Sequence, residues 1–367
     1  MGFGQRAVES LVMKPDFWRG KRILITGNTG FKGSWLSLWL QTLEADVSGY
    51  SLEPPTQPNL FSLASVGDGM QTRIADVRDL DRLVAAVTDI APEIVIHMAA
   101  QSLVRYSYTE PVETYATNVM GTVNLLEAVR RVGCARVALA VTSDKCYENT
   151  GSQQGYREGD PMGGADPYSS SKACSELIVS AFRNSYFSDA VSSGSTAVAS
   201  ARAGNVIGGG DWADDRLIPD VIKATAEGNP VEIRNPGAMR PWQHVLDPLQ
   251  GYLMLIEHLW ADGAGFSEGW NFGPEGQETV PVLHLIETLS ELSWGAIRYH
   301  TGSSDGPPEA AFLSLDCAKA RQRISWAPKL SLDTALEWVW EWYADYLQGG
   351  TNLQSVTRDQ INRYMQL

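Results

Sequence analysis

The sequence predicts an α/β protein with a doubly wound parallel sheet and a smaller, interleaved C-terminal lobe. Three observations predict this fold: short runs rich in β-branched residues, longer helical patterns between them, and the loosening of this alternation after residue 203. Parallel strands need long crossover connections, so alternating strand and helix signals indicate a parallel sheet with helices on both faces. The chain has 367 residues, of which 44% are hydrophobic, enough for one large core or two unequal ones.

Six short runs are predicted as strands, in order along the chain. They are Arg22 to Thr26, Asp46 to Ser51, Met70 to Ala75, Ile94 to Met98, Arg136 to Thr142 and Thr196 to Ala201. Between the first two, the amphipathic segment Ser34 to Leu43 is predicted as a helix. Much later, Trp242 to Leu259 again has the pattern of a strand running into a helix, which predicts that the chain returns to the sheet.

A glycine-rich turn separates the first predicted strand from the first predicted helix. It reads Gly27-Asn28-Thr29-Gly30-Phe31-Lys32-Gly33, with the spacing G-x-x-G-x-x-G. Glycines at such a turn let backbone amides approach a pyrophosphate, which then sits at the positive N-terminus of the helix. The turn therefore predicts a Rossmann-type dinucleotide cradle.

The position of the cradle near the start of the chain predicts how the domains are arranged along the sequence. Residues 1–203 are predicted as the dinucleotide-binding domain, with 242–262 returning to it, and 204–241 and 263–367 mainly as the substrate-binding lobe. The polar segment Glu148 to Gly164 is long for a simple connection, and we interpret it as a loop over the active site.

A tyrosine and a lysine four residues apart provide a candidate base. Asp166 is a good N-cap and Pro167 suits the first helical position, so Tyr168 and Lys172 should lie one turn apart on a helix. A free phenol has a pKa of about 10, and a cation within about 4 to 6 Å lowers an acid's pKa by about 1 to 3 units. We therefore expect Lys172 to lower the pKa of Tyr168 and to make it a base for a substrate hydroxyl.

Composition argues against several other classes of protein. The chain has 29 basic and 43 acidic residues and a net charge of -14, without a basic block that could follow a nucleic-acid backbone. No apolar run approaches the roughly 20 residues that span a bilayer. Five charges interrupt the first twenty residues, so we expect no signal peptide and a cytoplasmic protein. The four cysteines and five histidines lack the spacing of metal ligands, and no metal site is predicted.

The glycine turn and the Tyr-x-x-x-Lys pair together resemble the extended, nucleotide-sugar-modifying branch of the short-chain dehydrogenase/reductase superfamily. The resemblance covers nearly the whole chain from about Lys21. It also includes the run His97-Met98-Ala99-Ala100-Gln101 and the run Asn118-Val-Met-Gly-Thr, in which His97 is interpreted as structural. The cofactor contacts that it implies are Gly27, Asn28, Thr29, Gly30, Phe31, Gly33, Asp76, Val77, Ala99, Ala100, Asn118, Tyr168 and Lys172.

The second predicted strand bears on the choice of cofactor. An acidic residue after that strand selects NAD, whereas an arginine accepts the 2'-phosphate of NADP. Here Ser51 stands at the expected place, Glu53 follows slightly late, and no arginine is near. We therefore expect NAD, with NADP as the alternative. The resemblance implies that the cofactor is held tightly and regenerated in each turnover.

The run Ser143-Asp144-Lys145 indicates the reaction. In the sugar-nucleotide dehydratases of this branch a hydroxyl residue is followed by Asp and Glu, whereas this chain has Lys145 in place of Glu. The lysine at this position, together with the runs at 203–212 and 325–328, makes the sequence resemble the dehydratases that act on CDP-glucose. The resemblance implies oxidation at C4, loss of water across C5 and C6, and return of hydride to C6. Tyr168 and Ser143 would act at C4 and Asp144 at C6.

Lys145 has two possible roles. An ammonium with the reference pKa of about 10.4 is a poor base, so Lys145 must have a lowered pKa to act as the C5 base. Otherwise it stabilises the enolate oxygen. The base role is slightly favoured.

The resemblance also implies the substrate contacts and the assembly. The substrate-binding candidates are Asn205, Arg216, Arg240, Asn271 and Arg321, with Arg240 on a phosphate. The helices around Asn118 and Tyr168 imply a homodimer, or a tetramer built from it. Two alternatives remain from the same fold: a nucleotide-sugar 4-epimerase or a dehydratase for another nucleotide sugar. A third is a noncatalytic dinucleotide sensor.

Overall fold

A seven-stranded parallel sheet forms the centre of the computed structural model, which describes residues 13–152, 154–188, 195–274, 279–302, 313–350 and 352–367. The strand order is β11-β6-β5-β4-β1-β2-β3, and every neighbouring pair is parallel. The strands are β1 (Arg22–Thr26), β2 (Asp46–Ser51), β3 (Gln71–Ile74), β4 (Ile94–His97), β5 (Val137–Val141), β6 (Ala197–Ala203) and β11 (Gly269–Phe272). The predicted doubly wound α/β fold is confirmed.

Both faces of the sheet are buried, because alternate side chains of a strand point to opposite faces. In β1, Leu24 packs in one hydrophobic cluster, whereas Ile23 and Ile25 pack in the other. The first cluster includes side chains of α4 (Leu80–Ile90), α7 (Gly121–Val132) and α8 (Pro167–Tyr186). The second includes α2 (Phe31–Thr42), α10 (Leu246–Ala261) and α15 (Leu353–Gln366). The sheet is therefore the middle layer of three.

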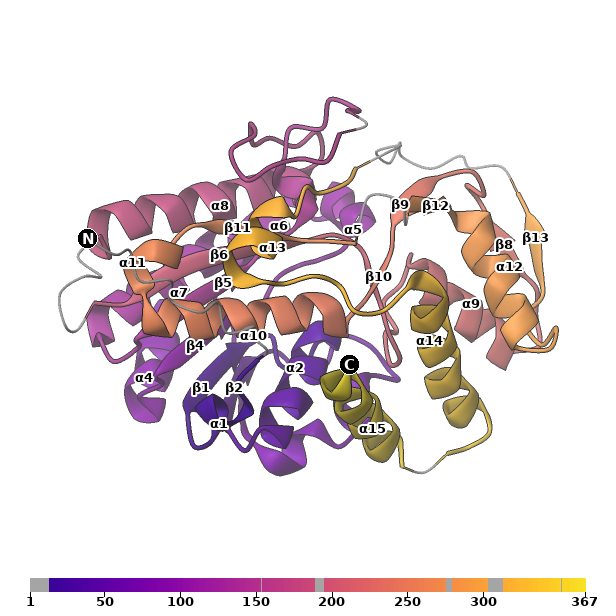
Figure 1. Cartoon of the computed structure of the whole chain (residues 1–367), viewed down its shortest axis with the longest axis horizontal. Helices are drawn as coiled ribbons and strands as arrows, with labels where there is room; N and C mark the ends of the chain where they lie inside the picture. Colours follow the sequence, from indigo (N-terminus) through magenta and orange to yellow (C-terminus); the bar gives the residue numbers. More distant parts are fainter. Residues whose placement is uncertain (1–12, 153, 189–194, 275–278, 303–312, 351) are drawn as a thin grey trace, which may run out of the picture.

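A smaller group of elements lies at one end of the molecule, away from the sheet (Figure 1). Its helices are α9 (Leu217–Ala226), α12 (Val282–Leu292) and α14 (Leu332–Leu347). Its strand pairs are β8 (Val231–Ile233) with β13 (Tyr299–Thr301), β9 (Met239–Pro241) with β12 (Thr279–Pro281), and β7 (Val206–Ile207) with β10 (Gln243–His244).

The chain passes between this group and the sheet more than once. It leaves the sheet after β6, returns through α10 and β11, leaves again, and ends with α15 packed beside α2 (Figure 1). Strand β11 lies within the range 263–367 that was assigned mainly to the smaller lobe. Its four residues, Gly-Trp-Asn-Phe, are too few and lack the β-branched residues that identified the other strands.

The first long helix starts earlier than predicted. The pattern predicted Ser34 to Leu43, but α2 runs from Phe31 to Thr42 and takes Gly30 as its N-cap. The polar and glycine residues of its first turn hide the helical pattern, although their backbone is helical. Residues 1–12, part of the segment for which no signal peptide was expected, lie outside the described residues.

The remaining short elements connect the layers. They are α1 (Pro15–Trp18), α3 (Leu60–Leu63), α5 (Val104–Thr109), α6 (Pro111–Tyr115), α11 (Gly263–Phe266), α13 (Ala318–Ile324), the 3-10 helices η1 (Val66–Gly69) and η3 (Asp144–Cys146), and the π-helical η2 (Ala116–Met120). Within the ranges that the structure describes, no helix has both the length and the hydropathy needed to cross a bilayer.

Candidate active site

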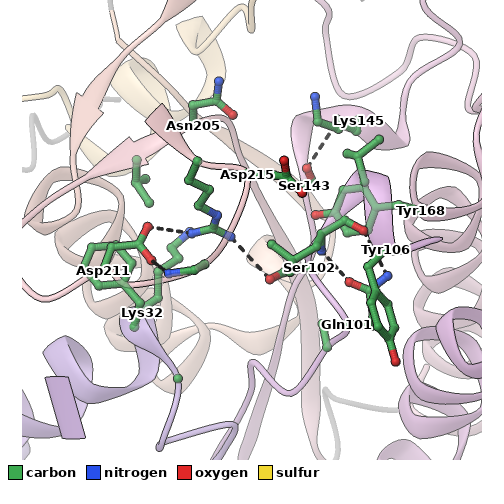
Figure 2. Close-up of a pocket in the computed structure, with 18 of the residues that line it drawn as sticks. Lys32, Gln101, Ser102, Tyr106, Ser143, Lys145, Tyr168, Asn205, Asp211 and Asp215 are labelled. Carbon is green, nitrogen blue, oxygen red and sulfur yellow. Dashed lines mark hydrogen bonds and ion pairs between the residues drawn. The ribbon is translucent and has the colours of Figure 1, made fainter. Parts of the chain in front are cut away.

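A large cleft of about 1880 Å³ lies between the carboxyl ends of the strands and the smaller group of elements. Its wall includes the glycine turn, the segments after β4 and β5, the start of α8 and parts of residues 203–242. In the close-up of Figure 2, Ser143, Lys145 and Tyr168 lie on one side of the cleft, with Lys32 and Asp211 on the other. Residues of the predicted loop 148–164, such as Glu148 and Met162, also line it.

The glycine turn has the shape of a cradle for a pyrophosphate. Gly27 has φ +78°, and a Cβ on Gly33 would lie 2.1 Å from the carbonyl oxygen of Gly27, so side chains are excluded at both positions. A Cβ on Gly30 would meet only that same oxygen, at 3.4 Å. The backbone at Gly30 is therefore open on its cleft side, beside the N-terminus of α2, and these residues fit a dinucleotide.

Most of the predicted cofactor contacts line the cleft. They are Gly27, Thr29, Gly30, Phe31, Gly33, Asp76, Val77, Ala99, Ala100, Tyr168 and Lys172. Thr29 also joins the turn to the end of β2, because its hydroxyl lies 2.7 Å from Oγ of Ser51 and donates to the carbonyl of Leu52 at 2.9 Å. The second strand and the turn are thus held together at the place where the adenosine of a dinucleotide would lie.

Two predicted cofactor contacts, Asn28 and Asn118, are not on the wall of the cleft. Asn28 is fully buried and donates through Nδ2 to Oγ1 of Thr72 at 3.0 Å. Asn118 accepts from the backbone N–H of Gln101 at 2.8 Å and donates to Gln101 O and to Oγ of Ser171, at 2.9 and 2.8 Å. Both side chains therefore hold segments that line the site, while Oδ1 of Asn28 has no hydrogen-bond partner among the described residues. Their role as cofactor contacts stays a prediction.

The helix α8 places Tyr168 and Lys172 in the cleft as the sequence predicted. Asp166 caps it by accepting from the backbone N–H of Ser169 at 2.9 Å, and Pro167 is its first residue. The expected lowering of the Tyr168 pKa by Lys172 is wrong for this structure. Burial raises the pKa of Tyr168 to about 12, only partly offset by a hydrogen bond with Ser143 and by the charge of Arg216. The Lys172 amine lies 6.0 Å from the centre of the ring.

The run Ser143-Asp144-Lys145 forms a tight turn at the end of β5. The Ser143 hydroxyl accepts from the backbone N–H of Lys145 at 3.2 Å and donates to Oδ1 of Asp144 at 2.9 Å. Both Ser143 and Asp144 are buried, and all three residues line the cleft. A carboxylate, a hydroxyl and an amine therefore share the wall with Tyr168. Such a set can move protons to and from a bound ligand.

A buried ion pair behind this turn was not predicted. Glu176 accepts from the Thr142 hydroxyl at 2.5 Å and pairs with Arg202 at 2.6 Å. Burial lowers the pKa of Lys172 to about 8, and the charge of Glu176 opposes that fall. Glu176 is four residues beyond Lys172, so the helical spacing that joined Tyr168 to Lys172 could also have found it.

Lys32 is a second residue that the sequence reasoning passed over. Its amine donates to the hydroxyl of Tyr252 at 3.0 Å and lines the cleft. Burial, followed by the charges of Lys172 and Arg216, lowers the pKa of Lys32 to about 7, against the opposite effect of Asp144. A cation inside the glycine turn was the signal available in the sequence.

Three of the five predicted substrate contacts line the cleft: Asn205, Arg216 and Arg240. Arg216 pairs with Asp211 at 2.9 Å and donates to Oγ of Ser102 at 3.3 Å. Asn271 and Arg321 do not line it, and their role as substrate contacts stays a prediction.

Asn271 is fully buried below the cleft. It accepts from the hydroxyl of Tyr147 at 2.7 Å and donates to the backbone carbonyl of Tyr156 at 2.8 Å. Because these partners use its amide, Asn271 fixes the loop that follows β5. Arg321 lies on α13, which packs against β11.

Comparisons with known proteins show the family and the fold of the chain. The family model for GDP-mannose 4,6 dehydratase matches residues 24–338. A CDP-glucose 4,6-dehydratase of Salmonella typhimurium is 48% identical over 95% of this chain and 98% of its own. A probable dTDP-glucose 4,6-dehydratase of Sinorhizobium fredii is 30% identical over 88% of this chain and 93% of its own. The solved dTDP-glucose 4,6-dehydratase of Bacillus anthracis, in complex with NAD, superposes with a TM-score of 0.71 and 24% identity, over 90% of this chain and 99% of that one.

Proposed function

The chain belongs to the family that the GDP-mannose 4,6 dehydratase model describes, and from this membership we propose that it is an NAD-dependent CDP-glucose 4,6-dehydratase. Such a hydro-lyase converts CDP-glucose to CDP-4-keto-6-deoxyglucose and water. One observation carries the proposal: a single cleft joins a dinucleotide cradle to a buried Tyr168 and Asp144. The 48% identity to a relative of that name supports the choice among nucleotide sugars.

The cofactor and the base act at C4 of the sugar. The glycine turn would hold NAD, which would supply the hydride chemistry needed at C4 and at C6. Tyr168 takes the proton of the C4 hydroxyl, and its phenolate form is favoured by the Ser143 hydrogen bond and by Arg216. Lys172 adds a positive charge near the ring, kept on the amine by Glu176.

Water is lost in the second half of the reaction. The C4 ketone makes the C5 proton acidic, so a base can remove it while the C6 hydroxyl leaves. Asp144, held by Ser143 at 2.9 Å, is assigned as the acid that protonates that hydroxyl. Lys145 either removes the C5 proton or stabilises the enolate oxygen, and the base role is favoured.

The direct test is turnover of CDP-, dTDP-, UDP- and GDP-linked glucose side by side, followed by mass spectrometry. We expect CDP-glucose to lose one water and the other substrates to react far more slowly. A product with the substrate's mass would indicate a 4-epimerase instead, and water loss from another nucleotide sugar would reassign the substrate. No turnover of any of them would favour a noncatalytic sensor.

We further propose that the protein forms a homodimer through α6, η2 and α8. Large apolar side chains are exposed along these elements, with Val112 80% exposed, Leu177 59% and Met120 50%. Such a patch on a folded protein indicates an interface. Light scattering should give the mass of a dimer, or of a tetramer built from it, and Leu177→Asp should reduce it. A monomeric wild-type protein would contradict the proposal.

A further inference from the structure

The end of the cleft remote from the glycine turn is built by α9 and β8. Leu217, Val231 and Ile233 give it apolar walls, and Asp220 and Arg234 add two opposite charges. Arg216 and Arg240 line the same cleft. A nucleotide sugar with its hexose at Tyr168 would place its diphosphate near these arginines, and its base would then reach the apolar walls.

The two charged side chains in this part of the cleft are only loosely paired. Nη2 of Arg234 lies 3.6 Å from Oδ2 of Asp220 and 3.5 Å from Oδ1 of Asp215. Charge-assisted hydrogen bonds are shorter, about 2.7 to 2.9 Å. Asp215 is also paired with Arg105, at 3.2 Å. The side chains of Asp220 and Arg234 are 33% and 39% exposed, so each can still bond to a ligand.

A neighbouring carboxylate and guanidinium match the edge of one pyrimidine better than the other. Cytosine presents an exocyclic amine, a donor, beside the ring acceptor N3. Uracil and thymine present a carbonyl oxygen beside an N3–H donor. A carboxylate accepts only and a guanidinium donates only, so with the carboxylate at the C4 substituent and the guanidinium at N3 the pair complements cytosine and opposes uracil at both atoms. The reverse order would complement uracil.

We propose that Asp220 and Arg234 select the nucleobase of the substrate, with Asp220 accepting from the exocyclic amine of cytosine and Arg234 donating to its N3. The apolar side chains Leu217, Val231 and Ile233 cover the faces of the ring. The inference rests on the proposed function, because it requires a nucleoside diphosphate sugar in the cleft.

The ionisation of Asp220 agrees with an acceptor role. Burial raises its pKa to about 6, Asp215 and Asp214 act in the same direction, and Arg234 and Lys223 oppose them. The carboxyl group is therefore ionised for the most part at pH 7.5, where it can only accept. Below its pKa it would carry a proton, and the preference for cytosine should weaken.

The test is calorimetric titration of the NAD-loaded protein with CDP and with UDP at pH 7.5, which measures binding without turnover. The wild type should bind CDP at least about 10-fold more tightly than UDP, the scale of discrimination that paired hydrogen bonds to a base edge provide. Asp220→Asn and Arg234→Met should each reduce the ratio of the two affinities about 10-fold. Thr225→Ala, an uncharged residue on the same helix but outside the cleft lining, is the matched control and should leave the ratio unchanged.

The experiment distinguishes a failure of the nucleobase proposal from a failure of the proposed dehydratase function. Equal binding of CDP and UDP by the wild type, or an unchanged ratio in both variants, would overturn the inference. If a variant fails to fold, the comparison on the wild-type protein still decides, with 2-pyrimidinone riboside diphosphate, which lacks the amine but keeps the N3 acceptor, expected to bind more weakly than CDP and more tightly than UDP. The proposed function fails separately, if CDP-glucose is not dehydrated even though CDP binds with the expected preference.

Discussion

Burial favours the neutral form of both Tyr168 and Lys172. It raises the pKa of the phenol to about 12 and lowers the pKa of the amine to about 8. The positive charge that the proposed reaction places near Tyr168 is therefore lost at moderately alkaline pH. The neighbouring carboxylate Glu176 limits this loss, which gives the buried ion pair with Arg202 a part in the chemistry of the site.

The pH dependence of the reaction should report the ionisation of Lys172. As the pH rises through about 8 the amine loses its proton, so kcat/KM should fall on the alkaline side. A guanidinium stays charged over this range, and Lys172→Arg should be slower but without that fall. A pH–rate profile measures both, with Lys223→Arg as a control that keeps the wild-type profile. The same alkaline fall in Lys172→Arg would assign it to another group.

Lys145 gives a second prediction at the scale of one side chain. If it is the C5 base, Lys145→Met should abolish solvent deuterium incorporation at C5 while C4 oxidation remains measurable. The loss of a general base typically costs about 100- to 10,000-fold in rate. Mass spectrometry of product formed in heavy water measures the exchange. Undiminished exchange at C5 would leave Lys145 with the enolate role only.

Individual residues were predictable where a local pattern carried the information. The three glycines of the turn, Tyr168, Lys172 and the Ser143 turn have fixed spacing, and all of them line the cleft. The direction of the Tyr168 pKa was wrong, because the degree of burial depends on the whole fold. The buried position of Asn271 likewise depends on the whole fold, because the partners of its amide come from distant parts of the chain.

At the scale of elements, the glycine turn between β1 and α2 must leave space for the cofactor and must also pack tightly against its own backbone. Substitutions at different glycines can separate these two constraints. Gly30→Ala should fold, since its Cβ meets only one atom at 3.4 Å, but the methyl group would enter the cradle. Gly33→Ala should destabilise the fold itself, because its Cβ would lie 2.1 Å from a carbonyl oxygen.

Thermal melting and NAD titration distinguish the two effects. Gly30→Ala should retain the wild-type Tm and lose about 10-fold or more in NAD affinity, about 1.4 kcal/mol. Gly33→Ala should lose about 1 to 3 kcal/mol of stability, the usual cost of overpacking. Gly237→Ala is the control, because no atom lies within 4 Å of its added Cβ. Wild-type NAD affinity in Gly30→Ala would contradict the position of the cradle.

The strands were predictable to within one or two residues because most are short runs of largely buried residues, whereas β3, at the edge of the sheet, is exposed or half-buried along its length. β1 and β2 have the predicted bounds, whereas β3, β4, β5 and β6 differ slightly at their ends. Strand β11 was missed because its pairing with β6 is a long-range contact, and four residues carry too little pattern. The start of α2 was missed for a local reason, since glycine is a poor helix former.

At the scale of the whole molecule, α15 fastens the C-terminal end of the chain to the main core. The hydroxyl of Tyr364 donates to Asp247 at 2.7 Å, and both side chains are buried. Burial raises the pKa of Asp247 to about 6, and the bond from Tyr364 limits that rise. The contact joins α15 to α10 beneath the sheet.

Removing this hydroxyl should destabilise the protein in a pH-dependent way. Tyr364→Phe should cost about 1 to 3 kcal/mol at pH 8, where Asp247 is ionised and loses a donor. The folded pKa of Asp247 lies above its unfolded value of about 3.9, so stability falls as the pH rises through this window, and the variant should fall further. The cost should therefore be smaller at pH 5.

Urea unfolding at the two pH values measures the difference. Tyr108→Phe is the control, because Tyr108 is 46% exposed, and it should match the wild type at both. An equal cost for Tyr364→Phe at pH 5 and pH 8 would show that Asp247 does not ionise in this range.

The order of the strands has a consequence for how the protein is made. The four strands β3, β2, β1 and β4 are neighbours in the sheet and are all complete by residue 97. As the ribosome releases the chain, this half of the sheet has every partner it needs before Tyr168 has been translated, and N-terminal segments fold first during synthesis. The edge of β4 then stays unpaired until β5, forty residues later, has been synthesised. A chaperone that shields exposed strand edges would bind at this edge of β4.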